Sequence, residues 1–387
     1  MPLPRAEYRV VVVGGGVIGL FTALHLARSG AGPILVLDRG FLSSGASGRN
    51  GGGVRQQWET RATVRLARES VAAYRRFGRD FGYNPWFRQT GYLFLATNPS
   101  ELGRLRTVHE LVRSEGLPSE VLGPAEVARH VPGIAPNAVF GGTYLRSDGT
   151  LYPFPVVWGV YEAARALGVD VAFGVEATGV EVRAGAVAGV RTSAGAVSTS
   201  AVVNAAGGWS AEFSRRAGLE VPNVATRHEI LATEALKPFL DPMVVRLSDG
   251  LYFSQTVRGE IVGGLTLAHR PGTAAGMPSS PKFLTAMSAA LVGLLPRLAR
   301  VRVLRAWSGF YDDTPDGLAV IGEDPRLKGF VHANGFGGHG FMLAPAATRR
   351  VARSVLGETT DLDPALFSPA RFLSARAPAV AERLQLG

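Results

Sequence analysis

The sequence predicts an α/β protein of two domains. One is a Rossmann-like dinucleotide-binding domain, and the other is built on a mixed or antiparallel sheet with flanking helices. Three observations predict this fold. The chain has 387 residues, about twice an ordinary domain of about 100–200 residues. A strand, a glycine turn, a helix and a second strand follow one another within residues 9–38. From about residue 221 the pattern changes to strands joined by short turns.

The first predicted element is a β-α-β unit. Arg9–Val13 is a run of mostly β-branched apolar residues, which is typical of a buried strand. Glycines follow, and Leu20–Ser29 then predicts a helix that ends at Gly30. Pro33–Leu37 predicts the second strand, which ends at Asp38.

Hydrophobic periodicity predicts the elements that follow. Helices are expected at residues 60–77, around 100–115, and at 154–167, 283–298 and 344–356. Strands are expected at residues 91–96, 139–145, 169–173, 177–183, 187–192, 201–204, 228–234, 318–321 and 330–333. A hairpin that turns at Arg258-Gly259 joins residues 251–257 to 260–267.

Four glycine-rich stretches lie far apart in the sequence, at residues 14–19, 45–53, 207–208 and 335–340. If they meet at one ligand, the ligand-binding domain is discontinuous. We therefore predict that the cofactor domain consists of residues 1–85, 145–220 and 308–387. The substrate-binding domain is predicted to consist of residues 86–144 and 221–307.

Composition excludes several kinds of site. The chain has no cysteine, so it offers no disulfide and no thiolate for a metal, and no metal site is apparent. The net charge of +10 comes from scattered arginines without a run of five basic residues, so we expect a solvated surface and no nucleic-acid partner. Residues 10–27 hold four glycines and fit a strand, turn and helix better than a membrane span. We expect no integral membrane span and a cytoplasmic location.

Gly14-x-Gly16-x-x-Gly19 lies between the first predicted strand and helix, and Asp38 follows Gly19 by nineteen residues. Gly14 permits a tight turn, Gly16 lets the backbone approach a pyrophosphate, and Gly19 lets the helix pack against the strand. The helix N-terminus attracts the pyrophosphate, and Asp38 can accept hydrogen bonds from ribose hydroxyls. The pattern predicts a dinucleotide site and leaves FAD and NAD both open.

Seven segments, in this order, carry a resemblance to a known family: VVVGGGVIGLFTALHLA (11–27), SGRNGGGVRQQW (47–58), FRQTGYLFLA (87–96), VVNAAGGWS (202–210), RHEILATEALKP (227–238), TPDGLAVIG (314–322) and GFGGHGFMLAPA (335–346). Over nearly its whole length the chain resembles the D-amino acid oxidase/glycine oxidase superfamily of FAD-dependent oxidoreductases. Within that superfamily it is most similar to the β subunits of sarcosine oxidase and of dye-linked L-proline dehydrogenase.

The resemblance implies FAD, bound non-covalently, as the cofactor. Heterotetrameric sarcosine oxidases hold FMN through a histidine where this chain has Pro153, and monomeric ones attach FAD to a cysteine, which is absent here. Met342 stands where monomeric sarcosine oxidases have a lysine tied to oxygen activation, so oxygen reactivity stays open. The residues that the resemblance places at FAD are Gly14, Gly16, Val17, Ile18, Gly19, Asp38, Arg39, Ser43, Ser44, Ser47, Gly48, Arg49, Asn50, Gly51, Gly52, Gly53, Ala177, Ala205, Ala206, Gly207, Gly335, Gly337, Gly338, His339, Gly340, Phe341 and Met342.

The resemblance also implies an activity, which is oxidation of an amino acid to its imine by hydride transfer to flavin N5. A secondary amine such as sarcosine or L-proline is favoured as the substrate. Arg55 matches the arginine that binds the substrate carboxylate in monomeric sarcosine oxidases, and Arg49 is the second candidate for contact with substrate or flavin. Tyr252 lines the substrate cavity or belongs to the core, and His339 contacts the flavin or the backbone of its own loop.

Other residues near these segments are expected to be structural. We place His228 in the wall of the substrate domain. Three more residues, Trp307, Tyr311 and Asp316, are expected to pack at the domain junction.

Two alternatives stay open. In the first, the enzyme class is the same and the substrate is a primary D-amino acid, glycine or an opine. In the second, the chain is an FAD-containing tRNA-modifying or nucleic-acid-binding protein. As partners the resemblance implies a small-molecule amino acid substrate and an electron acceptor, which is oxygen, a quinone or dye, or a partner subunit. The resemblance to β subunits also implies a hetero-oligomer with an α-type subunit as an option.

Overall fold

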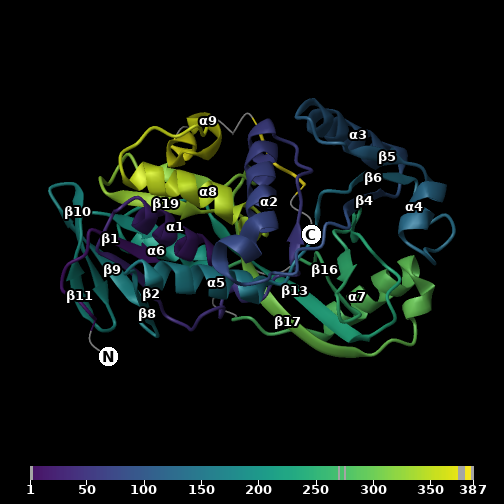
Figure 1. The fold of residues 1–387 in the computed structure, drawn as a ribbon, viewed down its shortest axis with the longest axis horizontal. Coiled ribbons are helices and arrows are strands. Elements are labelled where there is room, and N and C mark those ends of the chain that lie inside the picture. The colour runs from purple at the N-terminus through teal and green to yellow at the C-terminus, as the bar shows by residue number, and fades with distance from the viewer. Residues whose placement is uncertain (1–2, 269–270, 274–275, 374–379, 385–387) are drawn as a thin grey trace.

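The computed structural model describes residues 3–268, 271–273, 276–373 and 380–384. The described chain is mixed α/β and contains two large sheets, which occupy the two ends of an elongated molecule (Figure 1). Helices cover both sheets. The predicted fold class, a Rossmann-like sheet joined to a second, mixed sheet, is confirmed.

The first sheet is mainly parallel and has the order β18-β19-β12-β1-β2-β8. β18 runs antiparallel to β19, and the other pairings are parallel. Because β1 lies between β12 and β2, the strand order switches direction there, and such sheets bind ligands in the crevice at the carboxyl ends of those strands. The bounds are β1 Val10–Val13, β2 Ile34–Asp38, β8 Asp170–Phe173, β12 Val202–Asn204, β18 Val320–Glu323 and β19 Phe330–Asn334.

Alternate residues of β1 enter different cores. Val10 and Val12 belong to the core under α1, α5 and α8, while Val11 and Val13 belong to the core on the opposite face. Burial on both faces explains why β1 is a continuous run of valines. The elements that form these layers are α1 Val17–Arg28, α2 Arg61–Phe81, α5 Pro153–Ala166, α8 Gly340–Val355 and α9 Pro364–Phe367 on one side, and α6 Ser210–Arg216, β9 Ala177–Arg183, β10 Ala186–Thr192 and β11 Gly195–Ser198 on the other.

The second sheet has the order β17-β13-β16-β15-β14-β4-β6-β5, and β14 pairs with β4 in parallel. Helix α7 packs on it through Phe283 and Met287, and α3 and α4 lie beside β4–β6 (Figure 1). The predicted domain boundary at residue 308 falls inside β17, which is paired with β13. The bounds are β4 Tyr92–Ala96, α3 Pro99–Ser114, β5 Glu120–Leu122, α4 Pro124–His130, β6 Gly141–Leu145, β13 Val224–Ala235, β14 Met243–Arg246, β15 Tyr252–Gln255, β16 Glu260–Leu265, α7 Pro281–Leu294 and β17 Val303–Asp313.

Helix α8 begins at Gly340, four residues before the predicted start, so Gly340–Met342 form its first turn and not a loop. Pro345 lies inside this helix, where it lacks the N–H that would bond the carbonyl of Phe341. The hydroxyl of Tyr74 donates to that carbonyl at 2.5 Å. The buried carbonyl is therefore satisfied, and the helix can continue through the proline.

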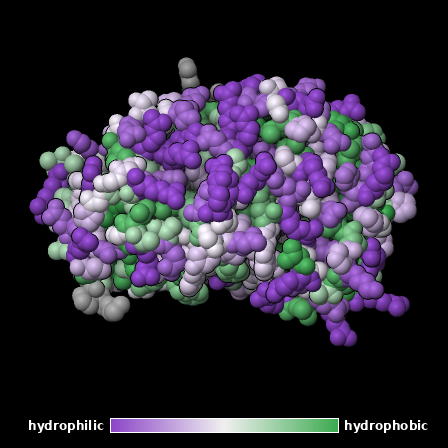
Figure 2. All heavy atoms as spheres, in the orientation of Figure 1, coloured by the Kyte–Doolittle hydropathy of each residue, from purple (hydrophilic) through white to green (hydrophobic). Residues whose placement is uncertain are grey.

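The longest helix, α2, is amphipathic. Thr60 caps it by accepting a hydrogen bond from the Thr63 N–H. Its buried face includes Val64, and its exposed face includes Arg65 and Arg75. Hydrophilic side chains cover its outward face (Figure 2). Within the described part of the chain, no helix combines the length and the apolar character needed to cross a membrane.

Candidate functional site

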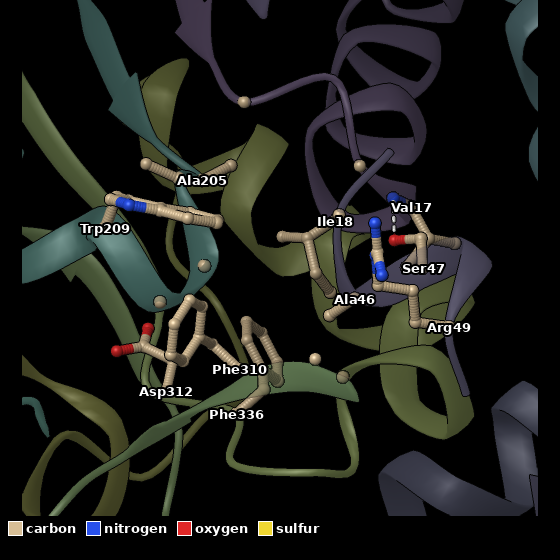
Figure 3. A pocket seen from close by; sticks show the side chains of 18 of the residues that line it. Val17, Ile18, Ala46, Ser47, Arg49, Ala205, Trp209, Phe310, Asp312 and Phe336 are labelled. Carbon is tan, nitrogen blue, oxygen red and sulfur yellow. Dashed lines mark hydrogen bonds between the residues drawn. The ribbon is translucent and has the colours of Figure 1, made fainter. Parts of the chain in front are cut away.

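A cavity of about 450 Å³ opens between the two sheets, at the carboxyl end of β1. All four glycine-rich stretches contribute residues to its lining, although they are far apart in sequence. Figure 3 shows part of the wall, with Ile18 and Ser47 on one side and Trp209 and Phe310 on the other. Of the residues that the family resemblance places at FAD, all line the cavity except Gly19, Gly48, Gly335 and His339.

The glycine turn after β1 needs glycine for space as well as for conformation. Gly14 has φ +113°, and a Cβ there would lie 2.2 Å from the carbonyl oxygen of Ala205. A Cβ on Gly19 would lie 1.8 Å from the carbonyl oxygen of Gly14. Gly19 therefore acts behind the cavity, by letting α1 press against the turn.

The N-terminus of α1, with its backbone N–H groups, faces the cavity. Its N-cap, Gly16, has no side chain to accept a hydrogen bond. The hydroxyl of Ser47 accepts one from the Val17 N–H at 2.9 Å (Figure 3), so its own O–H remains a donor. Helix N–H groups and a hydroxyl donor together suit a phosphate.

Asp38 is held at the end of β2 by two backbone donors. Its carboxylate oxygens accept hydrogen bonds from the Gly15 N–H at 2.8 Å and the Gly40 N–H at 2.7 Å. This orientation leaves the remaining lone pairs of the carboxylate for ribose hydroxyls. Next to it, the Arg39 guanidinium carbon lies 4.2 Å from the centre of the Trp209 ring. Trp209 lines the cavity and was not predicted, although its segment GGWS was part of the resemblance.

The loop after β2 is folded by its own polar groups. The Asn50 amide donates to the Ser47 carbonyl at 2.7 Å and accepts from the Gly52 N–H at 2.8 Å. A Cβ on Gly48 would lie 2.2 Å from the carbonyl oxygen of Ser43, so Gly48 permits the turn without lining the cavity. The loop therefore presents Ser43, Ser44 and Ser47 at the cavity wall.

Residues 51–53 form a smooth strip of backbone along the cavity. Strand β3 (Gly53–Val54) pairs with β7 (Gly149–Thr150). A Cβ on Gly52, which has φ +76°, would lie 2.0 Å from the carbonyl oxygen of Leu151. A side chain is therefore excluded at Gly52, and because Gly51 and Gly53 are also bare, a flat ring can lie against the strip.

Arg55 and His339 lie behind the cavity and do not line it. Arg55 is fully buried, with its guanidinium carbon 4.1 Å from the centre of the Trp58 ring. One of its nitrogens lies 3.2 Å from His339 Nε2 and also donates to the carbonyl of Leu384. Burial lowers the pKa of Arg55. The structure thus places the predicted carboxylate-binding arginine in an aromatic cage behind the wall.

Arg49, in contrast, lines the cavity. Its Nε donates to the Ser44 carbonyl at 2.9 Å, and Nη1 donates to the Ser308 carbonyl at 3.1 Å. The side chain passes over Gly309, where a Cβ would lie 3.5 Å from the Arg49 Cβ. Gly309 pairs with His228 in the sheet, so Arg49 stands beside the part of the wall that β13 and β17 form.

Two tyrosines and a histidine complete this part of the wall. The His228 and Tyr311 rings stack with centres 3.7 Å apart, and Tyr252 lies in β15, which β16 separates from the strand of His228. Burial raises the pKa of both tyrosines, so their hydroxyls stay neutral donors at neutral pH. Tyr252 lines the cavity and also belongs to the buried core, so the structure does not separate the two predictions for it. Tyr311 lines the cavity as well, which differs from the expected packing role.

Two other predicted packing residues are found in structural contacts. The Trp307 indole N–H donates to the Arg49 carbonyl at 2.9 Å, and buried Asp316 accepts from Arg371 Nε at 2.8 Å. The sequence analysis missed further lining residues, among them Ile230, Met243, Phe310 and Asp312. These residues lie on strands of the second sheet, and of the four only Ile230 falls within a segment that carried the resemblance.

The cavity therefore has the features of a dinucleotide-binding site: the glycine turn at the switch point, the donors at α1 and the acid at β2, with an aromatic wall beyond them. The family model for FAD dependent oxidoreductases (DAO) matches residues 9–354. The chain belongs to this family, and FAD is its cofactor.

Similar proteins cover nearly the whole chain. Sarcosine oxidase subunit beta of Rhizobium meliloti (strain 1021) is 31% identical over 352 residues, which cover 89% of this chain and 84% of that protein. The solved structure of L-proline dehydrogenase from P. horikoshii is 30% identical, with a TM-score of 0.89, and the match covers 96% of this chain and 99% of that one. Glycine oxidase from Geobacillus kaustophilus is 26% identical, with a TM-score of 0.87, covering 96% and 100%. These likenesses establish the chain as an enzyme that oxidises an amine or amino acid with FAD.

Proposed function

We propose that the chain oxidises a small amino acid that carries a secondary amine, such as sarcosine or L-proline, to its imine. The names of the R. meliloti relative and of the P. horikoshii structure support these two substrates. The observation that carries the proposal is the cluster of Arg49, Tyr252 and Tyr311 on the cavity wall, beside the glycine strip 51–53.

In this proposal Arg49 binds the substrate carboxylate. Two backbone carbonyls hold its guanidinium in place, so little side-chain freedom is lost when a carboxylate pairs with it. The two tyrosine hydroxyls orient the amine, and the surrounding apolar rings keep water out. Bound FAD supplies the acceptor for the hydride from the C–H bond next to the amine.

The amine must be neutral when that C–H bond breaks. The tyrosines are too weakly acidic to ionise and take its proton at neutral pH, because burial raises the pKa of each. The positive charge of Arg49 disfavours the ammonium form in the site. The substrate therefore binds as the free amine, and kcat/KM rises with pH up to the pKa of the amine itself.

Glycine is the second candidate substrate. The glycine oxidase structure from G. kaustophilus, with which the match covers 96% of this chain, favours it. A primary amine needs the same carboxylate contact and differs by the missing N-substituent. The two candidates are separated by comparing sarcosine with glycine at equal concentration.

The electron acceptor and the assembly are part of the proposal. Electrons leave the reduced enzyme to oxygen, to a quinone or dye, or to a partner subunit. The word subunit in the name of the R. meliloti relative supports a hetero-oligomer with an α-type partner. Isolation of the native complex, with measurement of its mass, tests this: a mass equal to that of the single chain argues against a partner.

An anaerobic absorbance titration tests the proposed reaction. The purified holoenzyme is mixed with sarcosine, L-proline, glycine or NADH, and the flavin bands are followed. We expect sarcosine or L-proline to bleach them and NADH to leave them unchanged. Flavin that stays oxidised with both secondary amines would contradict the proposed substrate class, and bleaching by glycine alone would favour the second candidate.

A further inference from the structure

A chain of buried polar side chains links the edge of the first sheet to the cavity, and the reaction proposed above does not use it. Asp324 at the end of β18 and His332 in β19 begin it, and Asn334, Asn223 and Asp312 continue it. All five are buried. Asn334 and Asp312 line the cavity.

The first half of the chain has a fixed direction. His332 Nε2 lies 3.0 Å from Asp324 Oδ2, and because a carboxylate can only accept, Nε2 carries the hydrogen. Burial lowers the pKa of His332, so the ring is neutral and its Nδ1 accepts. The Asn334 amide nitrogen lies 3.1 Å from Nδ1 and is the donor. The orientation of Asn334 follows from this, since its other end must be the acceptor oxygen.

The second half ends on Asp312. The Asn223 amide nitrogen donates to Asn334 Oδ1 at 3.0 Å and to Asp312 Oδ1 at 3.2 Å. The other carboxylate oxygen of Asp312 accepts from the Gly335 N–H at 2.6 Å. The Asp312 backbone carbonyl accepts from the Gly337 N–H at 2.9 Å. One residue thus holds both glycines of the turn that follows β19.

This turn needs an anchor of that kind. Gly335 and Gly337 have φ +70° and +55°, which only glycine adopts easily, and a glycine-rich segment loses much conformational freedom when it is ordered. Phe336 and Gly337 line the cavity, so the turn must be ordered when the cofactor is bound. A turn that is already held before binding removes that loss from the binding step.

We propose that Asp312 is a positioning residue for the cofactor: its carboxylate, fixed by the buried chain that starts at Asp324, preorganises the 335–338 turn on the wall of the FAD cavity. The proposal depends on FAD as the cofactor and not on the identity of the amine. The positioning role of Asp312 can therefore be wrong while the proposed substrate is right, and the substrate can be wrong while the positioning role is right.

Asp312→Asn tests the proposal with little change in shape. An amide nitrogen cannot accept a hydrogen bond, so either the Gly335 N–H or the Asn223 amide faces a donor. We expect the variant apoprotein to bind FAD about tenfold more weakly or worse, because a buried donor loses its carboxyl acceptor. The measurement is the dissociation constant from quenching of FAD fluorescence, without any amine, together with the visible circular dichroism of the bound flavin.

The matched control is Asp313→Asn, the next residue of β17, which does not line the cavity. It is expected to leave the FAD dissociation constant and the flavin dichroism unchanged. The melting temperature of each apoprotein separates positioning from general stability. If Asp312→Asn lowers this temperature while FAD affinity and dichroism stay at wild-type values, the residue is only structural and the proposal is overturned.

A second variant keeps the test decisive if Asp312→Asn does not fold. Asn223→Ser removes the link between Asn334 and Asp312 but leaves the Gly335 N–H bonded to the carboxylate. Asn223 does not line the cavity, so a direct contact with FAD cannot explain an effect. We expect FAD binding about threefold weaker or more, and unchanged affinity would overturn the proposal.

Discussion

At the scale of single residues, the two arginines of the glycine segment have different surroundings and should respond differently to substitution. Arg49 lines the cavity. Arg49→Met keeps an unbranched, largely apolar stem and removes the charge. We expect it to raise the dissociation constant of a carboxylated ligand about tenfold or more, and to leave binding of an amine without a carboxylate unchanged. Perturbation of the flavin absorbance by the ligand measures both.

The comparison variant is Arg55→Met. Arg55 is fully buried and bonded to the Leu384 carbonyl, so its loss leaves that acceptor unpaired and should lower the melting temperature. Ligand affinity should stay close to wild type. The opposite pattern, with a large effect of Arg55→Met on carboxylate affinity and none of Arg49→Met, would return the carboxylate role to Arg55.

A buried carboxyl gives a second prediction at this scale. Burial raises the pKa of Asp148 to about 7, against hydrogen bonds from Gln56 and Gln57 that lower it. Between about pH 4 and 7 the folded state therefore holds a proton that the unfolded state, with a pKa near 3.9, has released. The free energy of unfolding should fall as pH rises through this window. Asp148→Asn should reduce the slope by up to about 1.4 kcal/mol per pH unit, as measured by urea denaturation at several pH values.

Asp324 supplies the control of opposite sign. Burial pushes its pKa up, but hydrogen bonds from Arg326 and His332 outweigh burial and hold the pKa below its usual value. The stability that it contributes is present above about pH 4 and is lost as pH falls further. Asp324→Asn should therefore change the curve only at its acid end. A change between pH 4 and 7 equal to that of Asp148→Asn would show that the slope does not report Asp148.

At the scale of elements, the contact between α1 and β1 depends on Gly19. A Cβ there would overlap the carbonyl oxygen of Gly14, so Gly19→Ala must move α1 or the turn. We expect both a lower melting temperature and FAD binding weaker by about tenfold or more, since the phosphate donors at the start of α1 move too. Gly103→Ala in α3, where a Cβ meets nothing within 4 Å, should stabilise the protein by about 1 kcal/mol. Equal effects of the two variants would rule out the steric explanation.

The elements also show what the sequence could predict. The β-α-β unit, the hairpin at 258–259 and α7 were predicted because their signals are local. Strand β17 was not, because its partner β13 lies about eighty residues away and its own residues alternate weakly. The same reason explains why the buried position of Arg55 was not predicted. Its partners His339 and Leu384 are hundreds of residues distant in the sequence, and no spacing within residues 44–58 indicates them. The glycine motif was more informative, because its function is set by its own backbone.

At the scale of the whole molecule, the cavity joins segments from both sheets. Residues 14–18 and 205–209 come from the region of the first sheet, residues 228, 230 and 309–312 from the second, and residues 337, 338 and 340–342 from the turn and helix that close it. A ligand that spans the cavity must therefore stabilise all of these segments together. At a concentration of one hundred times its dissociation constant, such a ligand adds about 2.7 kcal/mol to the free energy of unfolding.

Removal of FAD should accordingly loosen distant segments at the same time. We expect amide hydrogen exchange in the apoprotein to speed up in 14–19, 38–53, 205–209 and 335–342, and to stay unchanged in α3 and α7, which do not line the cavity. ADP, which lacks the flavin, should restore slow exchange at 14–19 and near Asp38 but not at 335–342. If ADP alone protects 335–342, that turn contacts the nucleotide half of the cofactor. The glycine strip 51–53 and the first turn of α8 would then not be the place of the flavin ring.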